Sequence, residues 1–439
     1  MAFMNNNPAT KEVSVFWFRR DLRLEDNIGL MHALKGGLPV IPLFIFDDEI
    51  VDSLSRNDAR VSFIHACLEK INAALKLNGS CLLVKKGNFK EVWKELLLTY
   101  SIRKVFFNTD YEPYAIKRDK ELTELLSVNA IPTFSFKDQV IFEENDILKA
   151  DGKPYTVYTP YKNKWLHLFE LKPLEIVSDD ETEVHNFHKF NAVFPSLEAI
   201  GFAKSDQVVQ PYNLDNVSEY HNNRDFPAAN GTSSLSPHLR FGTISIRRLV
   251  EKVKSVNAVF LSELIWREFF MQILFHFPEV VTHNFKRKYD GIEWRNNPAD
   301  FKRWCEGKTG YPLVDAGMRE LNETGYMHNR VRMVTASFLC KHLLIDWKLG
   351  EAYFAEKLLD YELSSNNGNW QWAAGTGCDA APYFRVFNPT LQLKKFDKDV
   401  AYTRKWIPEF DFGYSEPMVD HAFARERCLR VYKEGLASM

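Results

Sequence analysis

The chain has 439 residues, which predicts two or three domains, and with 45% hydrophobic and 26% charged residues it has the composition of a soluble globular protein. A formal net charge of −2 argues against a protein held on nucleic acid or on a membrane by bulk charge, although a local basic face is compatible with it. The six cysteines form no CxxC pair, which argues against a disulfide framework, a zinc ribbon and an iron–sulfur cluster.

Short β-rich runs alternate with helical patterns over the first third of the chain. Four runs have the length and apolar content of buried strands: VSVFWF (13–18), LPVIPLFIF (38–46), CLLVKK (81–86) and KVFFN (104–108). Helical spacing falls between and after them, at 27–35, 58–78, 88–99 and 115–128. This order predicts βαβ units, and so a parallel, doubly wound (Rossmann-like) sheet in an α/β domain over residues 1–132.

Ligands of such a sheet bind beyond the carboxyl ends of its strands. Here those ends lead into the loops 19–26, 47–49 and 108–114. Neither the GxGxxG fingerprint of dinucleotide binding nor a P-loop for nucleotide phosphates is present in the sequence.

The patterns weaken over residues 133–204, which we interpret as a long interdomain linker. Its acidic piece SDDETEV (178–184) is typical of a solvated connector. Residues 205–439 are predicted to form an all-α domain, because apolar residues recur every three or four positions in five segments: Ser245–Val256, Leu261–Phe277, Val314–Asn322, Asn329–Leu344 and Glu351–Leu363.

The stretch SSNNGNWQWAAGTGCDAAPYF (364–384) departs from this pattern, since it is rich in residues that helices avoid. Trp370 and Trp372 would share a face in a strand and diverge in a helix. Binding a planar molecule would explain large aromatic side chains in so polar a setting, and ordinary turn chemistry is the alternative.

Two short motifs combine polar and aromatic residues at helical spacing. Glu263 and Trp266 share a face in SELIWREFF (262–270), as for a carboxyl group and an indole lining one cavity. An exposed ion pair between Glu263 and Arg267 is the commoner explanation of that spacing. In GYMHNRVRMV (325–334), Asn329 and Met333 share another helix face.

Two other motifs could contact phosphate. The hydroxyls of TSSLS (232–236) could hold a pyrophosphate, although a capping loop before a helix is the commoner explanation. Arg385 lies among aromatics in PYFRVFNP (382–389), a combination suited to a phosphate beside a stacked base.

Together these stretches resemble blocks of the photolyase/cryptochrome family, in the same order and over nearly the whole chain. The blocks are VFWFRRDLRLEDN near the start, GKPYTVYTPYKNKW (152–165), GTSSLS (231–236), ELIWREFF (263–270), EGKTGYPLVDAGMREL (306–321), MHNRVRM (327–333) and NNGNWQWAAGTGCDAAPYFRVFNP (366–389). The resemblance implies a light-driven flavoenzyme with an antenna-binding α/β domain and a helical domain that binds FAD.

The cofactor residues follow from matched positions. The ribose and phosphates of FAD are implied to contact Tyr220, Thr232, Ser233, Ser234, Leu235 and Ser236. Arg332 and Asp360 match an ion pair beside the flavin ring, and Asn366 matches the residue that faces flavin N5, where an amide can help a reduced or semiquinone flavin persist. Glu362 stands where most members have Asp, which puts that flavin contact in question.

The substrate-side positions resemble those of class I repair enzymes for cyclobutane pyrimidine dimers. The implied catalytic pocket, into which a dimer flips out of DNA, consists of Glu263, Trp266, Asn329, Met333 and Trp372. The implied DNA-contacting residues are Arg224, Arg267, Arg330 and Arg385. The (6-4) branch usually has His at the position of Asn329, so that activity is less favoured here.

Two further groups of residues are implied. Trp370, Trp347 and Trp294 match an electron relay that runs from the flavin to the surface, with simple packing as the alternative. Glu112, in DYEPYAIKRD (110–119), is the implied contact of an antenna chromophore, either methenyltetrahydrofolate or an 8-hydroxy-deazaflavin.

These observations predict a deoxyribodipyrimidine photolyase, a carbon–carbon lyase that uses reduced FAD and light to split cyclobutane pyrimidine dimers in UV-damaged DNA. The alternatives are a cryptochrome-like blue-light photoreceptor without repair activity, and a (6-4) or single-strand-specific photolyase. We expect a monomer without a membrane segment, located inside the cell, in the cytoplasm or nucleoid if bacterial, because no apolar run has the length of a signal peptide or a membrane span.

Overall fold

The computed structural model describes residues 11–177 and 186–438, and its contacts divide the chain into two compact units, which are described separately. Unit 1 comprises Met1–Glu143, Phe169–Gln210 and Leu235–Lys252, and unit 2 comprises Glu144–Leu168, Pro211–Ser234 and Val253–Met439. The acidic piece 178–184 lies outside the described residues. The expected domain boundaries remain a proposal, and the interval 133–204 contains both a strand and a helix.

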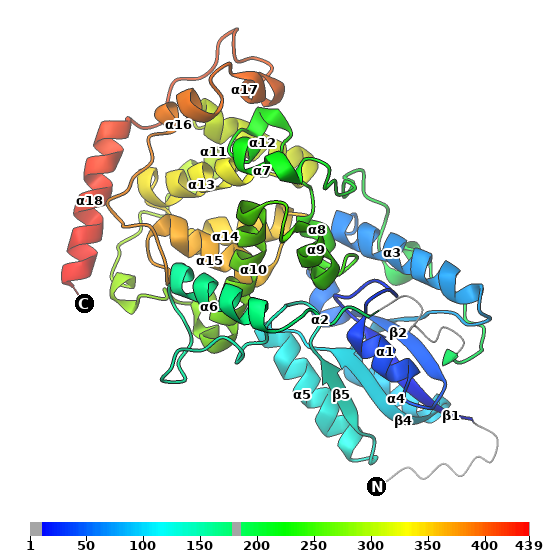
Figure 1. The fold of residues 1–439 in the computed structure, drawn as a ribbon. Helices are drawn as coiled ribbons and strands as arrows, with labels where there is room; N and C mark the ends of the chain where they lie inside the picture. Colours follow the sequence, from blue (N-terminus) through cyan, green and yellow to red (C-terminus); the bar gives the residue numbers. More distant parts are fainter. Residues whose placement is uncertain (1–10, 178–185, 439) are drawn as a thin grey trace. The chain divides into compact units, whose positions relative to one another are not determined.

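Unit 1 is built on one five-stranded parallel sheet with the strand order β3-β2-β1-β4-β5 (Figure 1). Its strands are β1 (Glu12–Phe18), β2 (Val40–Asp47), β3 (Leu83–Gly87), β4 (Ser101–Asn108) and β5 (Thr133–Phe136). The parallel α/β prediction is confirmed, with four strands close to their predicted positions. The fifth, β5, lies in the interval interpreted as linker, because its short run is only partly buried and gives a weak apolar signal.

Alternate residues of β1 enter separate cores on the two faces of the sheet. Phe16 and Phe18 pack with side chains of α1 and α3, whereas Val15 and Trp17 pack with side chains of α4 and α5. A strand covered on both faces has no polar side, which explains its continuous apolar sequence. The helices of this layer structure are α1 (Ile28–Leu34), α2 (Asp48–Val51), α3 (Ala59–Lys76), α4 (Phe89–Thr99) and α5 (Pro113–Ser127).

Two short helices later in the chain also belong largely to unit 1: α8 (Ser236–Arg240) and α9 (Ile246–Val253). Arg247 of α9 donates to the carboxylates of Asp26 and Asp138, and all three residues are buried. Removing one partner of such a buried ion pair leaves an uncompensated charge and is strongly destabilising. These ion pairs therefore hold α9 in unit 1.

Unit 2 is helical, and within the described residues no strand follows β5, so the all-α prediction for this part is confirmed. Its helices are α6 (Tyr158–Leu171), α7 (Tyr220–Asn223), α10 (Ala258–His276), α11 (Pro298–Cys305), α12 (Pro312–Thr324), α13 (Asn329–Ser337), α14 (Trp347–Lys357), α15 (Leu363–Ala374), α16 (Pro389–Phe396), α17 (Ala401–Trp406) and α18 (His421–Ala437). No helix in the described part of the chain combines the length and the apolar character needed to cross a membrane.

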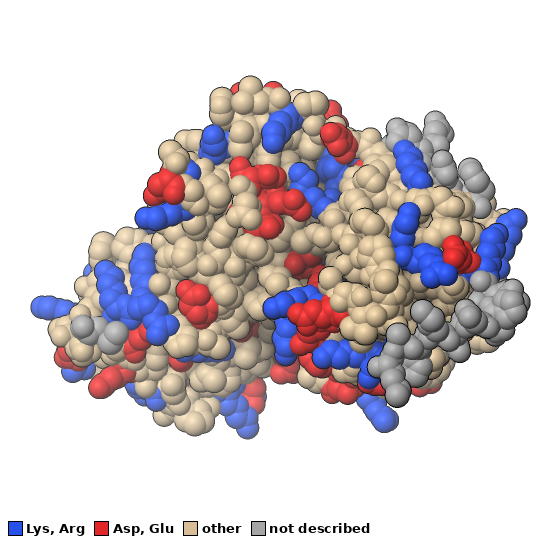
Figure 2. Space-filling view, turned by 90° about the horizontal axis from the view of Figure 1, so that it is seen from below, with Lys and Arg blue, Asp and Glu red and all other residues tan. Residues whose placement is uncertain are grey.

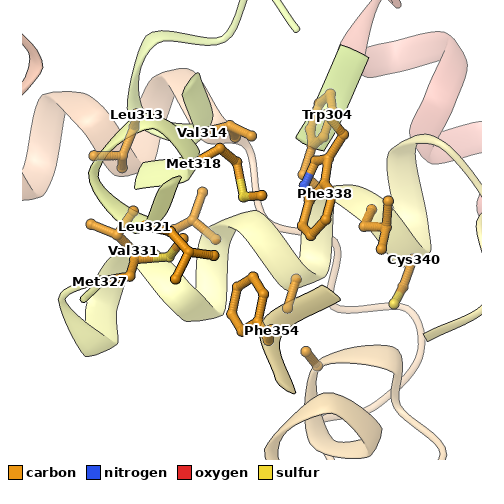
Figure 3. Packing of buried hydrophobic residues seen from close by; sticks show 14 of the residues in the cluster. Trp304, Leu313, Val314, Met318, Leu321, Met327, Val331, Phe338, Cys340 and Phe354 are labelled. Carbon is orange, nitrogen blue, oxygen red and sulfur yellow. The ribbon is translucent and has the colours of Figure 1, made fainter. Parts of the chain in front are cut away.

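The core of unit 2 gathers around Trp304, with Met318, Phe338 and Phe354 pointing into the same cluster (Figure 3). The helix expected over 329–344 is divided into α13 and a π-helical turn, Phe338–His342. Such turns occur mostly as short interruptions within α-helical runs.

One expectation near the end of this core is wrong, and the conformation left open for residues 364–384 is now defined in part. The helix expected over 351–363 ends at Lys357, because the backbone N–H of Leu359 donates to the carbonyl of Gly325 instead of continuing the helix. The first part of the polar stretch 364–384 is α-helical, as α15. Gly368 allows the ring of Phe270 to lie where a Cβ would otherwise be, 2.2 Å from the nearest ring carbon, so tertiary packing outweighs the poor helix propensity.

Candidate active site

Three helices of unit 2 carry most of the residues singled out in the sequence. Helix α15 packs against both α10 and α13 (Figure 1). Glu263, Trp266 and Arg267 lie on α10, whereas Asn329, Arg330, Arg332 and Met333 lie on α13, and Asn366, Trp370 and Trp372 lie on α15. The structure therefore brings together segments that are separated by about a hundred residues of sequence.

Arg332 and Asp360 form the ion pair that the resemblance implies. The two guanidinium nitrogens donate to the two carboxylate oxygens of Asp360 at 3.2 and 2.9 Å. Arg332 Nε also donates to the carbonyl of Met327 at 2.7 Å, which fixes the plane of the guanidinium. Two parallel bonds give such a pair both strength and direction.

Asn366 lies on the first turns of α15 with 9% of its surface exposed. Its Nδ2 donates to the backbone carbonyl and to the carboxylate of Glu351, at 3.1 and 2.9 Å. No group in residues 11–177 and 186–438 donates to its Oδ1, so this oxygen can accept a hydrogen bond from a ligand.

Glu362 and Arg267 face each other inside unit 2. Arg267 donates to Glu362 at 3.5 Å, and their side chains are 12% and 6% exposed. Ser365 donates to the second oxygen of Glu362 at 3.0 Å. The position of Arg267, among buried groups, suits a cofactor-side contact better than a contact with DNA phosphate.

The loop before α8 approaches α7 closely. A Cβ on Gly231 would lie 2.5 Å from Cβ of Asn223, and Ser234 has a positive φ of 52°. The hydroxyls of Thr232, Ser233 and Ser234 have no hydrogen-bond partner among the described residues. A tight loop with free hydroxyls fits the phosphates of a dinucleotide.

Tyr220 lies on α7, beside this loop, and its ring makes an edge contact with Phe260 at 5.0 Å between centroids. The remaining two predicted contacts, Leu235 and Ser236, belong to unit 1. The fit to FAD therefore rests on the loop hydroxyls, the Arg332–Asp360 pair and the open oxygen of Asn366. No cluster of three or more His, Cys, Asp or Glu in the described chain is arranged to hold a metal ion.

Glu263 pairs with Arg224, and not with Arg267 as its spacing along the helix would allow. The Arg224 side chain is 28% exposed and the Glu263 side chain is 33% exposed. Burial raises the pKa of the Glu263 carboxyl, while the guanidinium of Arg224 acts in the opposite direction. The site thus holds a carboxyl group that gains a proton more easily than an ordinary Glu.

Trp266 is half-buried, and one of its faces is covered by Tyr158. The two rings are parallel within 8°, with 3.5 Å between centroids. Tyr158 is itself fixed, because its hydroxyl donates to the carbonyl of Ser262 at 2.6 Å. Trp372 and Met333 are also half-buried and Asn329 is exposed, so all four predicted side chains keep surface for a ligand.

The amino end of α13 carries a second ion pair. Arg330 donates to Asp225 at 2.6 Å, and its guanidinium lies 4.3 Å from the centroid of Phe396. His328 caps this helix, as its Nδ1 accepts from the backbone of Arg330 at 3.2 Å. Burial lowers the pKa of His328 to about 4, so the ring stays neutral and can accept that bond. Arg385, the fourth predicted arginine, is exposed.

Two of the three predicted relay tryptophans belong to one hydrophobic cluster, and the third packs against it. Trp370 and Trp347 are 2% and 1% exposed, whereas Trp294 is partly exposed and packs against the same cluster. A further indole, Trp304, contacts Trp370 edge to face with 6.1 Å between centroids. Trp370 is buried and Trp294 is partly exposed, as expected for the two ends of an electron-transfer path that reaches the surface.

Glu112 lies in unit 1, just beyond the carboxyl end of β4. The chain order reverses between β1 and β4, which makes this edge the topological switch point of the sheet. Glu112 accepts from Arg20 at 3.1 Å and from Arg240 at 2.9 Å. The carboxylate is thus engaged by two guanidinium groups.

Sequence reasoning missed several partners of the predicted residues: Tyr158, Asp225, Trp304 and Glu351. Tyr158 lies in the block GKPYTVYTPYKNKW (152–165), but nothing in the sequence places it against Trp266. Asp225 and Glu351 contact residues on other helices, and such pairs carry no local signal.

Charges of both signs are interspersed on the face shown in Figure 2. This agrees with the net charge of −2 and leaves individual arginines, not bulk charge, as candidates for contact with nucleic acid.

Two family profiles match the chain, one described as DNA photolyase over residues 14–179 and one described as FAD binding domain of DNA photolyase over residues 260–412. The deoxyribodipyrimidine photo-lyase of Escherichia coli is 36% identical over 466 aligned residues, which cover 95% of this chain and 98% of that protein.

Solved structures give the same picture. The crystal structure of a bacterial class III photolyase from Agrobacterium tumefaciens has a TM-score of 0.84 at 33% identity, covering 99% of this chain and 100% of that chain. A cryptochrome from Synechocystis has a TM-score of 0.83 at 24% identity, covering 96% and 99% of the two chains, and at that identity the likeness shows the fold alone.

Proposed function

The chain belongs to the photolyase/cryptochrome family, and we propose that it is a light-driven DNA repair enzyme that splits cyclobutane pyrimidine dimers. One observation carries this proposal. Helices α13 and α15 each present a cofactor-type residue and a dimer-type residue: Arg332 with Asn329 on α13, and Asn366 with Trp372 on α15. A flavin and a flipped-out dimer could therefore be held next to each other.

The chain carries the FAD-binding domain of the family over residues 260–412. Bound in its reduced form, FAD would supply the reversible, light-driven one-electron chemistry that the proposed repair needs. Arg332, Asp360 and Asn366 would hold the flavin ring, and the loop hydroxyls of residues 232–234 would hold its phosphates.

The dimer would be bound by stacking and by hydrogen bonds. Trp266 would contact one base with the part of its indole that Tyr158 and Phe270, which both stack on it, leave open. Trp372 would stack on the second base, and Met333 would pack against the apolar edge. Glu263 would donate a hydrogen bond to a dimer carbonyl when protonated, and its raised pKa favours that form.

DNA backbone contacts would come from Arg224, Arg330 and Arg385. Arg330 is already paired with Asp225, so that ion pair would loosen as a phosphate approaches, whereas Arg224 uses one guanidinium nitrogen for Glu263 and would bind phosphate with another. Affinity for damaged DNA should accordingly fall as salt increases. Trp370, Trp347 and Trp294 would carry electrons from the surface when oxidised FAD is photoreduced.

An antenna chromophore would bind at the switch point of unit 1. The carboxylate of Glu112 already forms ion pairs with Arg20 and Arg240. Glu112 would contact the chromophore only if the chromophore also offered an acceptor to one of these two arginines. The absorption spectrum of the purified protein would identify the chromophore beside FAD.

The substitutions Glu263→Ala and Asn329→Ala test the assignment of the two sides of the site. Each should lower light-dependent repair of a dimer-containing duplex while FAD stays bound at one per chain. A control duplex with a (6-4) lesion and a dimer-containing single strand should be repaired less well by the unmodified protein. Loss of FAD from both variants would show that substrate and cofactor sides had been assigned wrongly.

A further inference from the structure

The indole N–H of Trp347 donates to a side chain of a neighbouring loop. Trp347 begins α14 and is 1% exposed, and its Nε1–H donates to Oδ1 of Asn284 at 2.8 Å. Among residues 11–177 and 186–438, the indole N–H groups of Trp370 and Trp294 donate to no other residue. The middle member of the proposed relay therefore has a polar contact that the two others lack.

The side chain of Asn284 can present only its oxygen to Trp347. An indole N–H donates and cannot accept, so the atom that lies 2.8 Å from it must be Oδ1. The amide nitrogen of Asn284 donates in turn to the carboxylate of Asp290 at 2.8 Å, and a carboxylate only accepts. Asn284 is 5% exposed, so these two partners fix one orientation of its amide.

The loop that carries Asn284 is bonded to α15, the helix of Trp370. The backbone N–H of Phe285 donates to Oε1 of Gln371 at 2.8 Å. Gln371 donates from its Nε2 to the carbonyl of His283 at 3.2 Å. Both chain neighbours of Asn284 are thus held by the residue that follows Trp370, so the amide is in place before any electron moves.

The proposed relay would place a positive charge on Trp347. Trp370 would give one electron to light-excited oxidised FAD and take one from Trp347, so a single electron moves at each step and no atom is transferred. The ammonium group of Lys348, 5.7 Å from the centroid of the Trp347 ring, opposes this charge. The amide oxygen of Asn284, polarised by the carboxylate behind it, favours the charge at the indole N–H.

An amide oxygen and a carboxylate differ in what they do with the indole proton. An indole that has lost an electron is a much stronger acid than the intact ring. An amide is too weak a base to take that proton, so the N–H stays on Trp347 and the charge can pass to Trp294. A carboxylate in the same place would take the proton and leave an uncharged radical at Trp347.

We propose that Asn284 is a positioning residue of the electron relay, which stabilises oxidised Trp347 and leaves its proton in place so that the charge moves on to Trp294. The inference rests on the proposed relay, and it concerns photoreduction of oxidised FAD and not the repair of the dimer. Asn284 acts through Trp347 and carries no electron itself.

The test uses FAD-loaded Trp294→Phe protein, in which the charge stops at Trp347. After a laser flash, transient absorption follows the radical, because the indole cation and the deprotonated radical have different spectra. Adding Asn284→Leu removes the acceptor, so the charge should shift back toward Trp370. The electron should then return from FAD about tenfold faster, the effect of losing one hydrogen bond to a charged group.

A second variant exchanges the amide and the carboxylate. Asn284→Asp together with Asp290→Asn keeps the net charge of the pair but puts a base at the indole N–H. In the same Trp294→Phe background, this exchange should convert the cation into the deprotonated radical, which should persist longer than the cation. A long-lived cation in the exchanged protein would overturn the inference.

The hydrogen bond is also tested in the dark, by NMR-detected hydrogen exchange of the Trp347 indole N–H. Exchange should be faster in Asn284→Leu. The matched control is Asn72→Leu in unit 1, where an equally buried asparagine accepts from the backbone of Leu82 at 2.9 Å, and it should change neither exchange nor electron return. Thermal unfolding and FAD content show that each variant is folded and loaded.

Three results would contradict the inference or its premise. If Asn284→Leu leaves indole exchange or electron return unchanged, Asn284 does not stabilise oxidised Trp347. If Trp347→Phe alone leaves photoreduction of FAD unimpaired, Trp347 is not part of a relay and the inference fails with it. Dimer repair by chemically reduced protein does not use the relay, so its failure would refute the proposed function and not the role of Asn284.

Discussion

Removing the positive charge of Arg224 should change the proton affinity of Glu263. The two side chains form an ion pair that is 28% and 33% exposed. Burial raises the pKa of Glu263, and Arg224 is the main group that opposes this rise. In Arg224→Ala that opposition is lost, so the carboxyl should bind a proton at a higher pH than in the unmodified protein.

The magnitude follows from the geometry. A guanidinium in contact with a carboxylate lowers its pKa by about 1 to 3 units. About a third of each side chain faces solvent, which screens the pair, so the upward shift of the Glu263 pKa in Arg224→Ala should be smaller than loss of a fully buried partner would give. If protonated Glu263 donates to the dimer, the pH at which repair falls to half its acid-side level should rise together with that pKa.

The assay is the yield of repaired dimer per absorbed photon, measured against pH with damaged duplex in excess. Arg224→Lys should keep the midpoint of the unmodified protein, because it keeps the charge. Glu263→Gln should remove this titration altogether. Arg404→Ala, which removes an exposed arginine paired with Asp411, is the charge-matched control. An unchanged midpoint in Arg224→Ala would refute the coupling.

Three further predictions concern other parts of unit 2. Asp360→Asn should weaken FAD binding about tenfold, because the guanidinium of Arg332 loses its charged partner. The affinity is measured as flavin released on dilution, and undiminished affinity would contradict the role of that pair. Trp370→Phe should slow photoreduction of oxidised FAD while repair by chemically reduced protein continues, and unimpaired photoreduction would exclude this tryptophan from the relay. Burial lowers the pKa of Lys341 from 10.5 to about 8. Between pH 8 and pH 10.5 the unfolded chain therefore binds more protons than the folded one. The free energy of unfolding should rise by about 3 kcal/mol as the pH increases through this range. Lys341→Met should lack that rise in chemical denaturation, and an identical pH dependence in both proteins would contradict the assignment.

The sheet of unit 1 could be predicted because its strands are buried on both faces. Residues such as Phe16 and Trp17 enter opposite cores, and this gives continuous apolar runs that local patterns detect. By contrast, β5 is short and only partly buried, so its run resembles a loop.

Helix α15 could not be predicted from propensity, because what stabilises it lies elsewhere in the sequence. Asn367 and Gln371 both donate to the carbonyl of Val280, and Gly368 receives the ring of Phe270. The polar residues of this stretch are thus engaged inside the protein. The question of whether the two tryptophans share a face is also answered, since in a helix Trp370 is buried and Trp372 stays half-exposed.

In the candidate site, too, some features could be predicted from the sequence and others could not. The Arg332–Asp360 pair was implied by resemblance and is present in the structure. The partners that set the state of the other predicted residues, Arg224 for Glu263 and Glu351 for Asn366, come from other helices and depend on tertiary packing.

The most direct test of the central proposal is repair by the purified protein itself. A duplex with one cyclobutane pyrimidine dimer is incubated with protein that holds fully reduced FAD, either under near-UV or blue light or in the dark, and intact pyrimidines are quantified. We predict that the dimer disappears in the light and persists in the dark. Persistence of the dimer under light, with reduced FAD confirmed in the same sample by its spectrum, would contradict the proposal and favour a photoreceptor without repair activity.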